Sequence, residues 1–319
     1  MASSRVETAD LSIRRLRVSF RVMRDSLRVV DEVSLDFQAG RHTALLGETG
    51  CGKSVLASAI LGLLPESATV SGAVCALGHD NLLSLPSRDM NRLRGRALVL
   101  IPQNPSGSLN PVFRVGRQLA ESIRLNAGDA SWKNRPEPSD LLARVGLDAP
   151  KRVERLFPHQ LSGGMAQRVV TAAGLAGMPR IVFADEPTKG LDAEARKICI
   201  DLLRTHFGRC VLMLITHDLK AAVGLPRVAV MYAGEIVEVC EGRDFPWRVL
   251  HPYTRGLVRA HPAFGLTPIW GAAPSPAALP TGCRFAPRCA QADDRCRAEH
   301  PPLVPYAPDR SVRCLHACP

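Results

Sequence analysis

The feature that most constrains this chain is a glycine-rich loop between a short apolar run and a helix-forming run. The apolar run is TALL, residues 43–46, and the helix-forming run is VLASAILGLL, residues 55–64. The loop between them consists of Gly47, Glu48, Thr49, Gly50, Cys51, Gly52, Lys53 and Ser54. It fits the pattern G-x-x-x-x-G-K-[ST] in the strand, turn and helix context that this pattern requires. An α/β domain with a phosphate-binding loop is therefore expected.

The chemistry of this loop predicts a site for a nucleoside triphosphate. Its glycines let the backbone N–H groups point at phosphates, Lys53 reaches the β and γ oxygens, and Ser54 can ligate Mg²⁺. The stretch RIVFADEP, residues 180–187, delivers two carboxylates to the end of an apolar run. Asp185 is expected to hold the Mg²⁺ shell and Glu186 to polarise a water. An ordinary glycine turn and a solvated pair of acids are the structural alternatives.

Apolar runs and helix-forming segments alternate along the first three quarters of the chain, which favours a largely parallel sheet. The expected buried strands are HTALLG, ALVLIPQ, RIVFADEP and VLMLITHD. Residues 104–179 contain no comparable run and are expected to form a helical subdomain. Thirteen of the 25 prolines follow Phe245, a density that disfavours long helices and central strands. We therefore expect an ATPase domain over residues 1–245 and a small irregular extension over residues 246–319.

Composition limits the class of partner without choosing one. A chain of 319 residues with 46% hydrophobic content is globular, and its net charge of +11 suits a nucleotide, a nucleic acid or an anionic lipid surface. The first residues lack the apolar run of a signal peptide, so export is not expected. Charged residues and a proline interrupt the most apolar stretch, residues 211–232. Any role at a membrane is therefore expected to depend on a partner.

A second helix start also favours an anion. In LSGGMAQRVV, residues 161–170, Ser162 is a good N-cap, and Gly163 and Gly164 permit close approach of a ligand to the backbone. Many helices begin this way without binding anything, so this segment is a modest signal by itself. Three further short motifs share the chain with it: Gln103 in IPQNP, the tripeptide GLD at residues 190–192, and His217 in ITHD.

Taken in order, these motifs resemble the nucleotide-binding subunit of ABC transporters over residues 14–241. The resemblance implies an α/β P-loop NTPase of ABC type with a helical subdomain, binding ATP and Mg²⁺. In that family two cassettes pack head to tail, so one chain's glycine loop and the other chain's signature segment hold the same ATP. Two phosphate sites on one chain would then serve two ATP molecules.

The resemblance also implies a role for each motif residue outside the loop. Gln103 senses Mg²⁺ and couples to the membrane subunits, and Asp185 holds the metal. Glu186 orients the attacking water, and His217 contacts the γ-phosphate. Ser162, Gly163 and Gly164 contact the γ-phosphate in trans, and Asp192 communicates across the dimer. Phe20 is the candidate for stacking on adenine, with a core phenylalanine as the alternative. Lys189 stands where the family more often has a small residue, which favours a non-identical second ATPase over a homodimer.

The C-terminal part narrows the resemblance. LHPYTRGLVRAHP, residues 250–262, and the cysteine-containing tail are similar to the C-terminal extension of oligopeptide, dipeptide and nickel importer ATPases. The implied function is ATP hydrolysis that powers uptake of peptides or a related small solute such as nickel or a metal chelate. The implied partners are two transmembrane permease subunits, a second ATPase and, indirectly, an extracytoplasmic solute-binding protein, at the cytoplasmic face of the inner membrane. An ATPase acting on nucleic acid or the ribosome, or an exporter subunit, is the alternative, and no nucleic acid is expected as a partner.

Four tail cysteines, Cys283, Cys289, Cys296 and Cys314, are separated by five, six and seventeen residues, with Cys318 in addition. Zinc sites usually place ligands in pairs two to four residues apart, whereas a four-thiolate iron–sulfur cluster tolerates wider spacing. Some members of the resembled family carry a [4Fe–4S] cluster here, so we favour a cluster over zinc, and both over a disulfide. Free thiols packed as small apolar groups are the remaining alternative. Because the tail and the glycine loop are assigned to different domains, changes at the cysteines are expected to affect ATP binding little.

Overall fold

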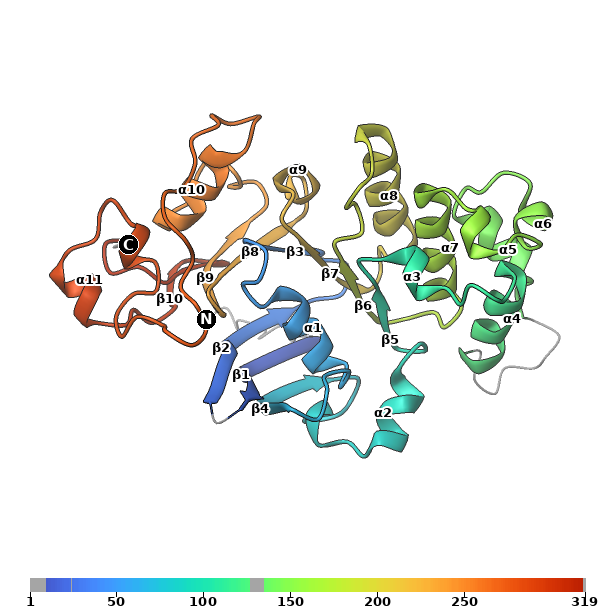
Figure 1. Cartoon of the computed structure of the whole chain (residues 1–319), viewed down its shortest axis with the longest axis horizontal. Coiled ribbons are helices and arrows are strands. Elements are labelled where there is room, and N and C mark those ends of the chain that lie inside the picture. The colour runs from blue at the N-terminus through green and yellow to red at the C-terminus, as the bar shows by residue number, and fades with distance from the viewer. Residues whose placement is uncertain (1–9, 24, 127–134, 318–319) are drawn as a thin grey trace, which may run out of the picture. The chain divides into compact units, whose positions relative to one another are not determined.

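The structure is a computed structural model that describes residues 10–23, 25–126 and 135–317 (Figure 1). The chain forms two compact units. Unit 1 consists of residues 1–84 and 216–319, and unit 2 of residues 85–215. Cys318, the additional tail cysteine, lies outside the described residues.

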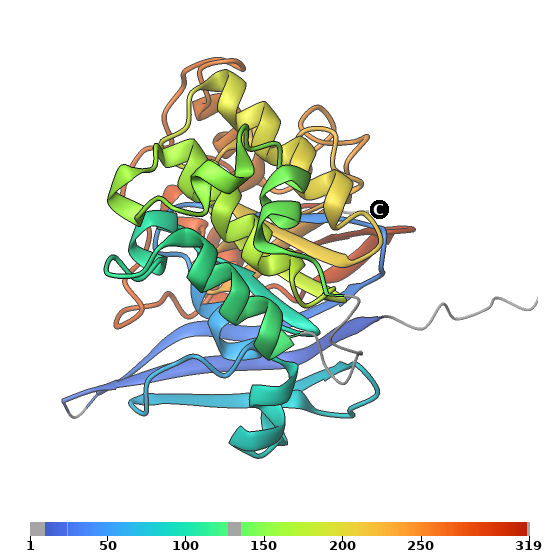
Figure 2. The same ribbon diagram turned by 90° about the vertical axis from the view of Figure 1, so that its right-hand side faces the viewer.

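Unit 1 contains a three-stranded antiparallel sheet in the order β2-β1-β4. Its strands are β1 (Leu11–Val22), β2 (Asp25–Phe37) and β4 (Ala68–Ala76). The blue strands β1 and β2 and the cyan strand β4 run side by side in both views (Figures 1 and 2). The face of this sheet that carries Leu11, Ile13, Val33 and Leu35 is buried, so it contributes to the core of unit 1.

A second group of strands in unit 1 is mixed in direction and includes part of the C-terminal tail. Strands β3 and β8 are parallel, and β8 continues through antiparallel pairs with β9, β11 and β10. Their bounds are β3 (Thr43–Leu46), β8 (Arg227–Tyr232), β9 (Glu235–Glu241), β10 (Val304–Ala307) and β11 (Arg310–Val312). Because β11 pairs with β9, the tail extends the same sheet that contains β3, the strand before the glycine loop.

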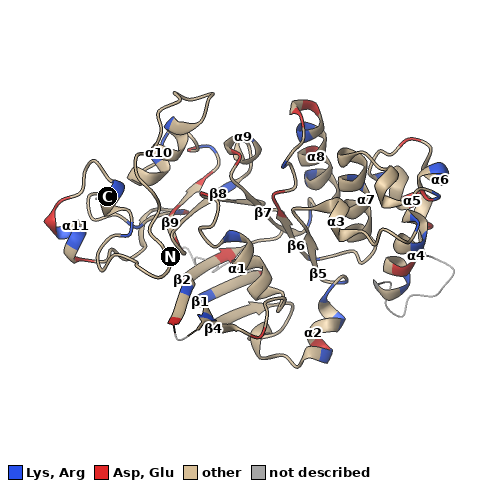
Figure 3. Ribbon diagram, in the orientation of Figure 1, with Lys and Arg blue, Asp and Glu red and all other residues tan. Residues whose placement is uncertain are grey.

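The helices of unit 1 are short and begin at recognisable caps. They are α1 (Lys53–Ile60), α9 (Leu219–Ala222), α10 (Pro252–Ala260) and α11 (Asp294–Ala298), with 3-10 turns at Leu82–Ser84 and Ala286–Arg288. His251 caps α10, and Pro252 occupies the first helical position, where a missing N–H costs nothing. Asp293 caps α11, on which acidic and basic side chains adjoin (Figure 3).

Unit 2 contains three parallel strands in the order β7-β6-β5. They are β5 (Leu98–Ile101), β6 (Ile181–Asp185) and β7 (Val211–Thr216). Every residue of β6 and β7 is buried, which explains why these strands read as continuous apolar runs rather than alternating ones.

The remaining elements of unit 2 are helices. They are α2 (Ser87–Leu93), α3 (Pro105–Ser108), α4 (Val115–Asn126), α5 (Pro138–Arg144), α6 (Pro150–Val153), α7 (Gly163–Leu175) and α8 (Ala193–His206), with a 3-10 turn at Pro158–Gln160. Helix α7 packs closely against β5, since a Cβ atom added at Gly174 would lie 3.1 Å from Cγ1 of Val99. Small residues along α7 make this approach possible.

The predicted α/β fold is confirmed, and all four expected strands form. Among the described residues between 104 and 179 there are helices and no strand, as expected for the helical subdomain. The compact units divide the chain at residues 84/85 and 215/216, whereas the predicted boundary near residue 245 followed composition. No helix in the described parts of the chain has the length and hydropathy needed to span a membrane. Lys and Arg residues are spread over many elements of both units, including α2, α6, α8 and α11 (Figure 3).

Candidate functional site

The glycine loop connects β3 to α1 in unit 1. Gly52, the N-cap of α1, adopts a left-handed backbone with φ of 108°. A Cβ atom there would lie 2.7 Å from the carbonyl oxygen of Val29, so both the backbone conformation and the space require glycine. Gly50 is also left-handed, with φ of 84°, and an added Cβ would meet nothing within 4 Å. The loop therefore turns tightly at Gly52 while Gly50 lies in open space, where a ligand can approach the backbone.

Lys53 places its charge inside the loop. Its Nζ donates to the carbonyl oxygens of Gly47 at 2.7 Å and Glu48 at 2.9 Å, and it lies 3.7 Å from Sγ of Cys51. The residue is only 6% exposed. Burial raises the pKa of the Cys51 thiol despite the nearby ammonium. The loop thus concentrates one buried cation among backbone carbonyls, an arrangement suited to meeting phosphate oxygens.

Residues far along the chain hold the outer side of the loop. The N–H of Glu48 donates to Oη of Tyr253 at 2.9 Å, and the N–H of Gly234 donates to the carbonyl oxygen of Cys51 at 3.0 Å. Arg288 donates to both carboxylate oxygens of Glu48, at 3.0 and 3.1 Å. Sequence reasoning missed Tyr253 and Arg288 as site residues. The HPYT stretch, which contains Tyr253, indicates only the subfamily, and no motif points to Arg288.

Two other predicted residues of the nucleotide site also lie in unit 1. Phe20 is partly exposed near the end of β1, where it pairs with Leu27 of β2 and Ala68 of β4. It is therefore not a fully buried core residue, which keeps it available as the adenine-stacking candidate. His217 is exposed directly after β7.

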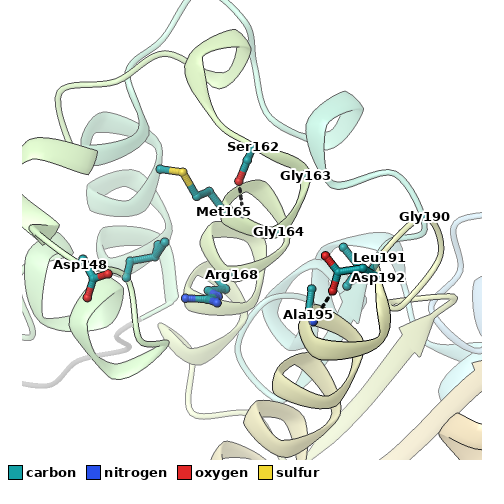
Figure 4. Close-up of a pocket in the computed structure, with 11 residues that line it drawn as sticks. Asp148, Ser162, Gly163, Gly164, Met165, Arg168, Gly190, Leu191, Asp192 and Ala195 are labelled. Carbon is teal, nitrogen blue, oxygen red and sulfur yellow. Dashed lines mark hydrogen bonds between the residues drawn. The ribbon is translucent and has the colours of Figure 1, made fainter.

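In unit 2 the predicted signature segment and the GLD motif form one pocket of about 480 Å³ (Figure 4). Ser162 caps α7 by accepting a hydrogen bond from the N–H of Met165 at 3.2 Å, and Asp192 caps α8 by accepting one from Ala195 at 2.8 Å. The pocket is lined by Leu147, Asp148, Ser162, Gly163, Gly164, Met165, Arg168, Gly190, Leu191, Asp192 and Ala195. The structure thus brings together four residues, Ser162, Gly163, Gly164 and Asp192, to which the family resemblance gives roles across a dimer of ATPases.

The predicted catalytic carboxylates lie at the end of β6 in unit 2. Asp185 and Glu186 are both nearly buried. Glu186 adopts a left-handed backbone with φ of 45°, and its N–H donates to the carbonyl oxygen of Ile215 at 2.8 Å. Non-glycine residues in this region are uncommon and often mark functional positions. Gln103 is exposed two residues after β5, the strand next to β6.

The four tail cysteines gather in one lobe of unit 1. The N–H of Cys283 donates to the carbonyl oxygen of Cys296 at 2.8 Å. Burial raises the pKa of Cys283 to about 11, and the neighbouring Cys296 thiol adds to this rise. Burial also raises the pKa of Cys289, with a further contribution from Cys314, and that of Cys296, with one from Cys289. Each of the four thiols therefore lies close enough to at least one of the others to influence it electrostatically.

One group of side chains in this lobe brings three potential metal ligands close together. Tetrahedral zinc with Zn–S bonds of about 2.3 Å would hold thiolates about 3.8 Å apart. Among the described residues, Asp293, Cys296 and His316 are the only three whose potential ligand atoms all lie within 4.8 Å of one another. Asp293 accepts from the N–H of Cys296 as the α11 cap, which accounts for its position. Cys283, Cys289 and Cys314 belong to no such group in the part of the chain that the structure describes.

Sequence comparison identifies both parts of the chain. The profile of a family described as "ABC transporter" matches residues 30–189, which include the glycine loop, the signature segment and both carboxylates. A profile described as "Oligopeptide/dipeptide transporter, C-terminal region" matches residues 237–296. The Escherichia coli "Dipeptide transport ATP-binding protein DppD" is 36% identical over 312 residues, covering 95% of this chain and 95% of that protein. This chain belongs to the oligopeptide and dipeptide ABC transporter ATP-binding family.

Other members of the family differ in length. The Mycobacterium tuberculosis "Oligopeptide transport ATP-binding protein OppD" is 40% identical over 316 residues, which cover 96% of this chain but 51% of that protein. The chain thus spans about half the length of this relative and nearly all of DppD.

A solved structure supports the fold. The ATP-binding cassette MJ0796, solved as a dimer in a post-hydrolysis state with ADP and Pi, aligns with a TM-score of 0.64 over 74% of this chain and all of that chain. At 23% identity this likeness concerns the fold alone. The expected membership in the ABC ATPases is therefore confirmed by sequence, and the expected fold by structure.

Proposed function

We propose that this chain is the ATP-hydrolysing subunit of an ABC importer that takes up peptides or a related small solute such as nickel or a metal chelate. The observation that carries the proposal is the presence of two separate sites on one chain. Unit 1 holds the glycine loop, and unit 2 holds the pocket between Ser162 and Asp192. One chain can hold an ATP in its loop and present its pocket to the ATP of a second ATPase.

The proposed binding step uses residues of the loop. Exposed N–H groups around Gly50 meet the phosphates, and Lys53 exchanges its carbonyl partners for β and γ phosphate oxygens. Ser54, Gln103 and Asp185 would hold Mg²⁺, which neutralises charge that develops on the phosphates. Phe20 would stack on adenine.

The proposed chemical step uses Glu186 and His217. Glu186 accepts a proton from the attacking water and orients it in line with the γ-phosphate, and His217 contacts that phosphate. Ser162, Gly163 and Gly164 would donate to the same phosphate of the ATP held by the second ATPase, and Asp192 would link the two sites. Hydrolysis therefore depends on two ATPases closing over each nucleotide.

The names of the relatives, which are ATP-binding proteins of oligopeptide or dipeptide transport, support the class of solute. We propose that two permease subunits in the membrane and a second ATPase complete the transporter, and that the second ATPase is non-identical because of Lys189. An extracytoplasmic solute-binding protein would deliver the solute. The chain would sit peripherally on the cytoplasmic face of the inner membrane. The match of residues 237–296 favours this function over an exporter or a nucleic-acid ATPase.

Solute uptake tests the proposed function. Cells lacking this chain are supplied with radiolabelled trialanine or radioactive nickel, and are complemented with the wild-type chain or with Lys53→Ala. We expect uptake of one of these solutes to be lost and to be restored by the wild type only. Normal uptake of both solutes without this chain would refute the function.

We further propose that Cys283, Cys289, Cys296 and Cys314 hold a [4Fe–4S] cluster. The supporting observations are the backbone hydrogen bond from Cys283 to Cys296 and the electrostatic influence within three pairs of these thiols, Cys283 with Cys296, Cys296 with Cys289, and Cys289 with Cys314. When bound, the cluster would cross-link a proline-rich lobe that has few apolar residues of its own. The thiols must deprotonate to bind it, so the raised pKa values apply to the metal-free lobe.

Iron analysis tests the cluster. Protein purified without oxygen is expected to be brown and to contain about four irons per chain. A colourless preparation with stoichiometric zinc would establish the zinc alternative instead. A preparation with neither metal, whose tail still resists proteases, would show that packing alone orders the lobe.

A further inference from the structure

The C-terminal region makes direct polar contacts with the glycine loop. Arg288 lies 240 residues after Glu48, yet its Nη1 and Nη2 donate to the two oxygens of that carboxylate at 3.0 and 3.1 Å. Such a fork is a strong and directional form of ion pair. The Arg288 side chain is 6% exposed and that of Glu48 is 29% exposed, so water screens the pair only partly.

Arg288 is itself held firmly. Its Nε donates to the carbonyl oxygen of Trp270 at 3.2 Å, and Nη1 also approaches Oη of Tyr232 at 3.4 Å. Burial disfavours its charge, but the hydrogen bonds to Glu48 and Tyr232 outweigh burial and raise the pKa of Arg288. The guanidinium is thus a fixed cation beside the loop rather than a mobile surface charge.

Tyr253 fixes the same residue of the loop through its backbone. Its Oη accepts the N–H of Glu48 at 2.9 Å, and its ring packs on Tyr232 with centroids 4.4 Å apart and on Phe285 at 5.5 Å. His251 orients this part of α10 by accepting the N–H of Tyr253 on Nδ1 at 3.0 Å. Tyr253 therefore belongs to a rigid aromatic cluster that includes a residue of the cysteine lobe.

The negative charge of Glu48 means that these contacts can affect phosphate binding. A carboxylate in a loop that receives a triphosphate adds like charge at close range, which opposes binding. Arg288 neutralises this carboxylate and, through its fork, fixes the direction in which the side chain points. Tyr253 in turn fixes the Glu48 peptide, so this part of the loop is held in place without a ligand.

We propose that Arg288 and Tyr253 are positioning residues of the ATP site, through which the C-terminal region neutralises and orients Glu48 of the phosphate loop. The C-terminal region is then a constituent of the nucleotide site, and ATP affinity depends on its being in place. The proposal rests on ATP binding by residues 47–54, which titration of the wild type checks separately.

The decisive experiment is a charge rescue on the full-length chain. Trinitrophenyl-ATP is titrated, with ATP as competitor, into the wild type, Arg288→Ala, and Arg288→Ala combined with Glu48→Gln. We expect Arg288→Ala to weaken ATP binding about tenfold, as loss of a charge-assisted pair implies, and the second change to restore most of the affinity. A role in folding alone would not produce this rescue.

A matched control removes another arginine of the same lobe. Arg297 pairs with Asp294 at 3.2 Å on the surface of α11, so Arg297→Ala changes the net charge equally and should leave ATP affinity as in the wild type. Tyr253→Phe keeps the ring and removes the acceptor, and should weaken ATP binding severalfold. In the assembled transporter both loop-contact variants should raise the KM for ATP more than they lower kcat.

Two results would overturn the proposal. One is wild-type ATP affinity in a folded Arg288→Ala chain. The other is failure of Glu48→Gln to recover affinity in that background, which would show that the carboxylate charge is not what Arg288 controls. If Arg288→Ala does not fold, Arg288→Lys provides the comparison, because it keeps the charge and loses the fork. Its ATP affinity should then be measurably lower than that of the wild type, and wild-type affinity would count against orientation of Glu48.

Discussion

Ser162 and Asp192 line one pocket although each caps a different helix of unit 2 (Figure 4). An added Cβ at Gly163 or Gly164 would meet nothing within 4 Å in this chain. Side chains at these positions are therefore compatible with the fold of the single chain. If the pocket receives the ATP of a second ATPase, they would instead collide with that ATP.

Gly164→Val is expected to fold and to bind ATP in its own loop, while ATP-driven association and turnover fall. Light scattering follows association, and phosphate release follows turnover. Gly164→Ala should give a smaller loss of both, because it fills less of the pocket. Equal turnover in the valine variant and the wild type would show that the signature segment does not form part of the ATP site.

Glu186→Gln tests the water-activating role. The amide keeps the size of the side chain but cannot accept the proton, so turnover should fall by about 10²–10⁴-fold while ATP affinity is retained. A closed dimer should accumulate with ATP. Glu194→Gln, at an exposed position in the first turn of α8, removes the same charge and serves as the control. If turnover persists in Glu186→Gln, another group activates the water.

Much of the fold was predictable because each buried strand leaves a recognisable apolar run in the local sequence. In unit 2, β6 and β7 are buried on both faces, so their sequences are unbroken apolar runs that end in polar residues. Strand β1 was not among the four expected buried strands, because charged residues such as Arg14 and Arg15 interrupt its apolar positions where the strand shifts register. The tail strand β11 is three residues long, too short for any pattern to reveal it.

Some parts of the candidate site were likewise predictable from local sequence, and others were not. The glycine loop and the signature segment depend on backbone shape within a few residues, which leaves a local signature in glycine and cap positions. The pairs of Glu48 with Arg288 and of Asp31 with Arg284 join residues more than 230 positions apart. Nothing near either residue identifies its partner, because the path of the whole chain sets the pairing.

Cys51 should react slowly with maleimides. Burial raises the pKa of its thiol, so little reactive thiolate exists at neutral pH, and the rate of ATPase inactivation should rise about tenfold per pH unit below that pKa. Bound ATP should protect, because an adduct would occupy the space of the phosphates. Cys51→Ser should retain activity and resist the reagent. Inactivation that continues in this variant would implicate a different thiol.

His251 predicts an acid-sensitive contribution to stability. Burial lowers the pKa of His251 from 6.5 to about 3. Above pH 6.5 the residue is neutral in both the folded and the unfolded chain. Between pH 6.5 and 3 only the unfolded chain takes up the proton, so the free energy of unfolding falls as pH falls, by up to about 1.4 kcal/mol per pH unit.

The variant His251→Asn isolates this effect. Asparagine can still cap α10 but does not titrate, so the variant should lose less stability than the wild type on acidification. Denaturant unfolding at a series of pH values measures the difference. Other groups that titrate, such as Glu238, are present in both proteins and cancel. Parallel stability curves for the two proteins would mean that His251 has the same pKa in the folded and the unfolded chain.

The variant Cys289→Ser tests whether the tail lobe affects the nucleotide site. The assignment of the tail and the loop to different domains had implied little effect of the cysteines on ATP binding. The structure places Arg288, the residue before Cys289, on Glu48 of the loop. If a cluster holds Cys289, its loss should free the adjacent backbone and loosen the Arg288 fork.

We therefore expect Cys289→Ser to lose the brown colour, to become more sensitive to proteases in the tail, and to bind ATP more weakly than the wild type. Cys75→Ser, on β4, removes a thiol outside the lobe and should change none of these. Iron content, limited proteolysis and ATP titration measure the three effects on the same preparations. A bleached Cys289→Ser protein with wild-type ATP affinity would show that Arg288 holds Glu48 without help from the cluster. If the wild type is colourless and Cys289→Ser still weakens ATP binding, then packing within the lobe, rather than a cluster, connects Cys289 to the nucleotide site.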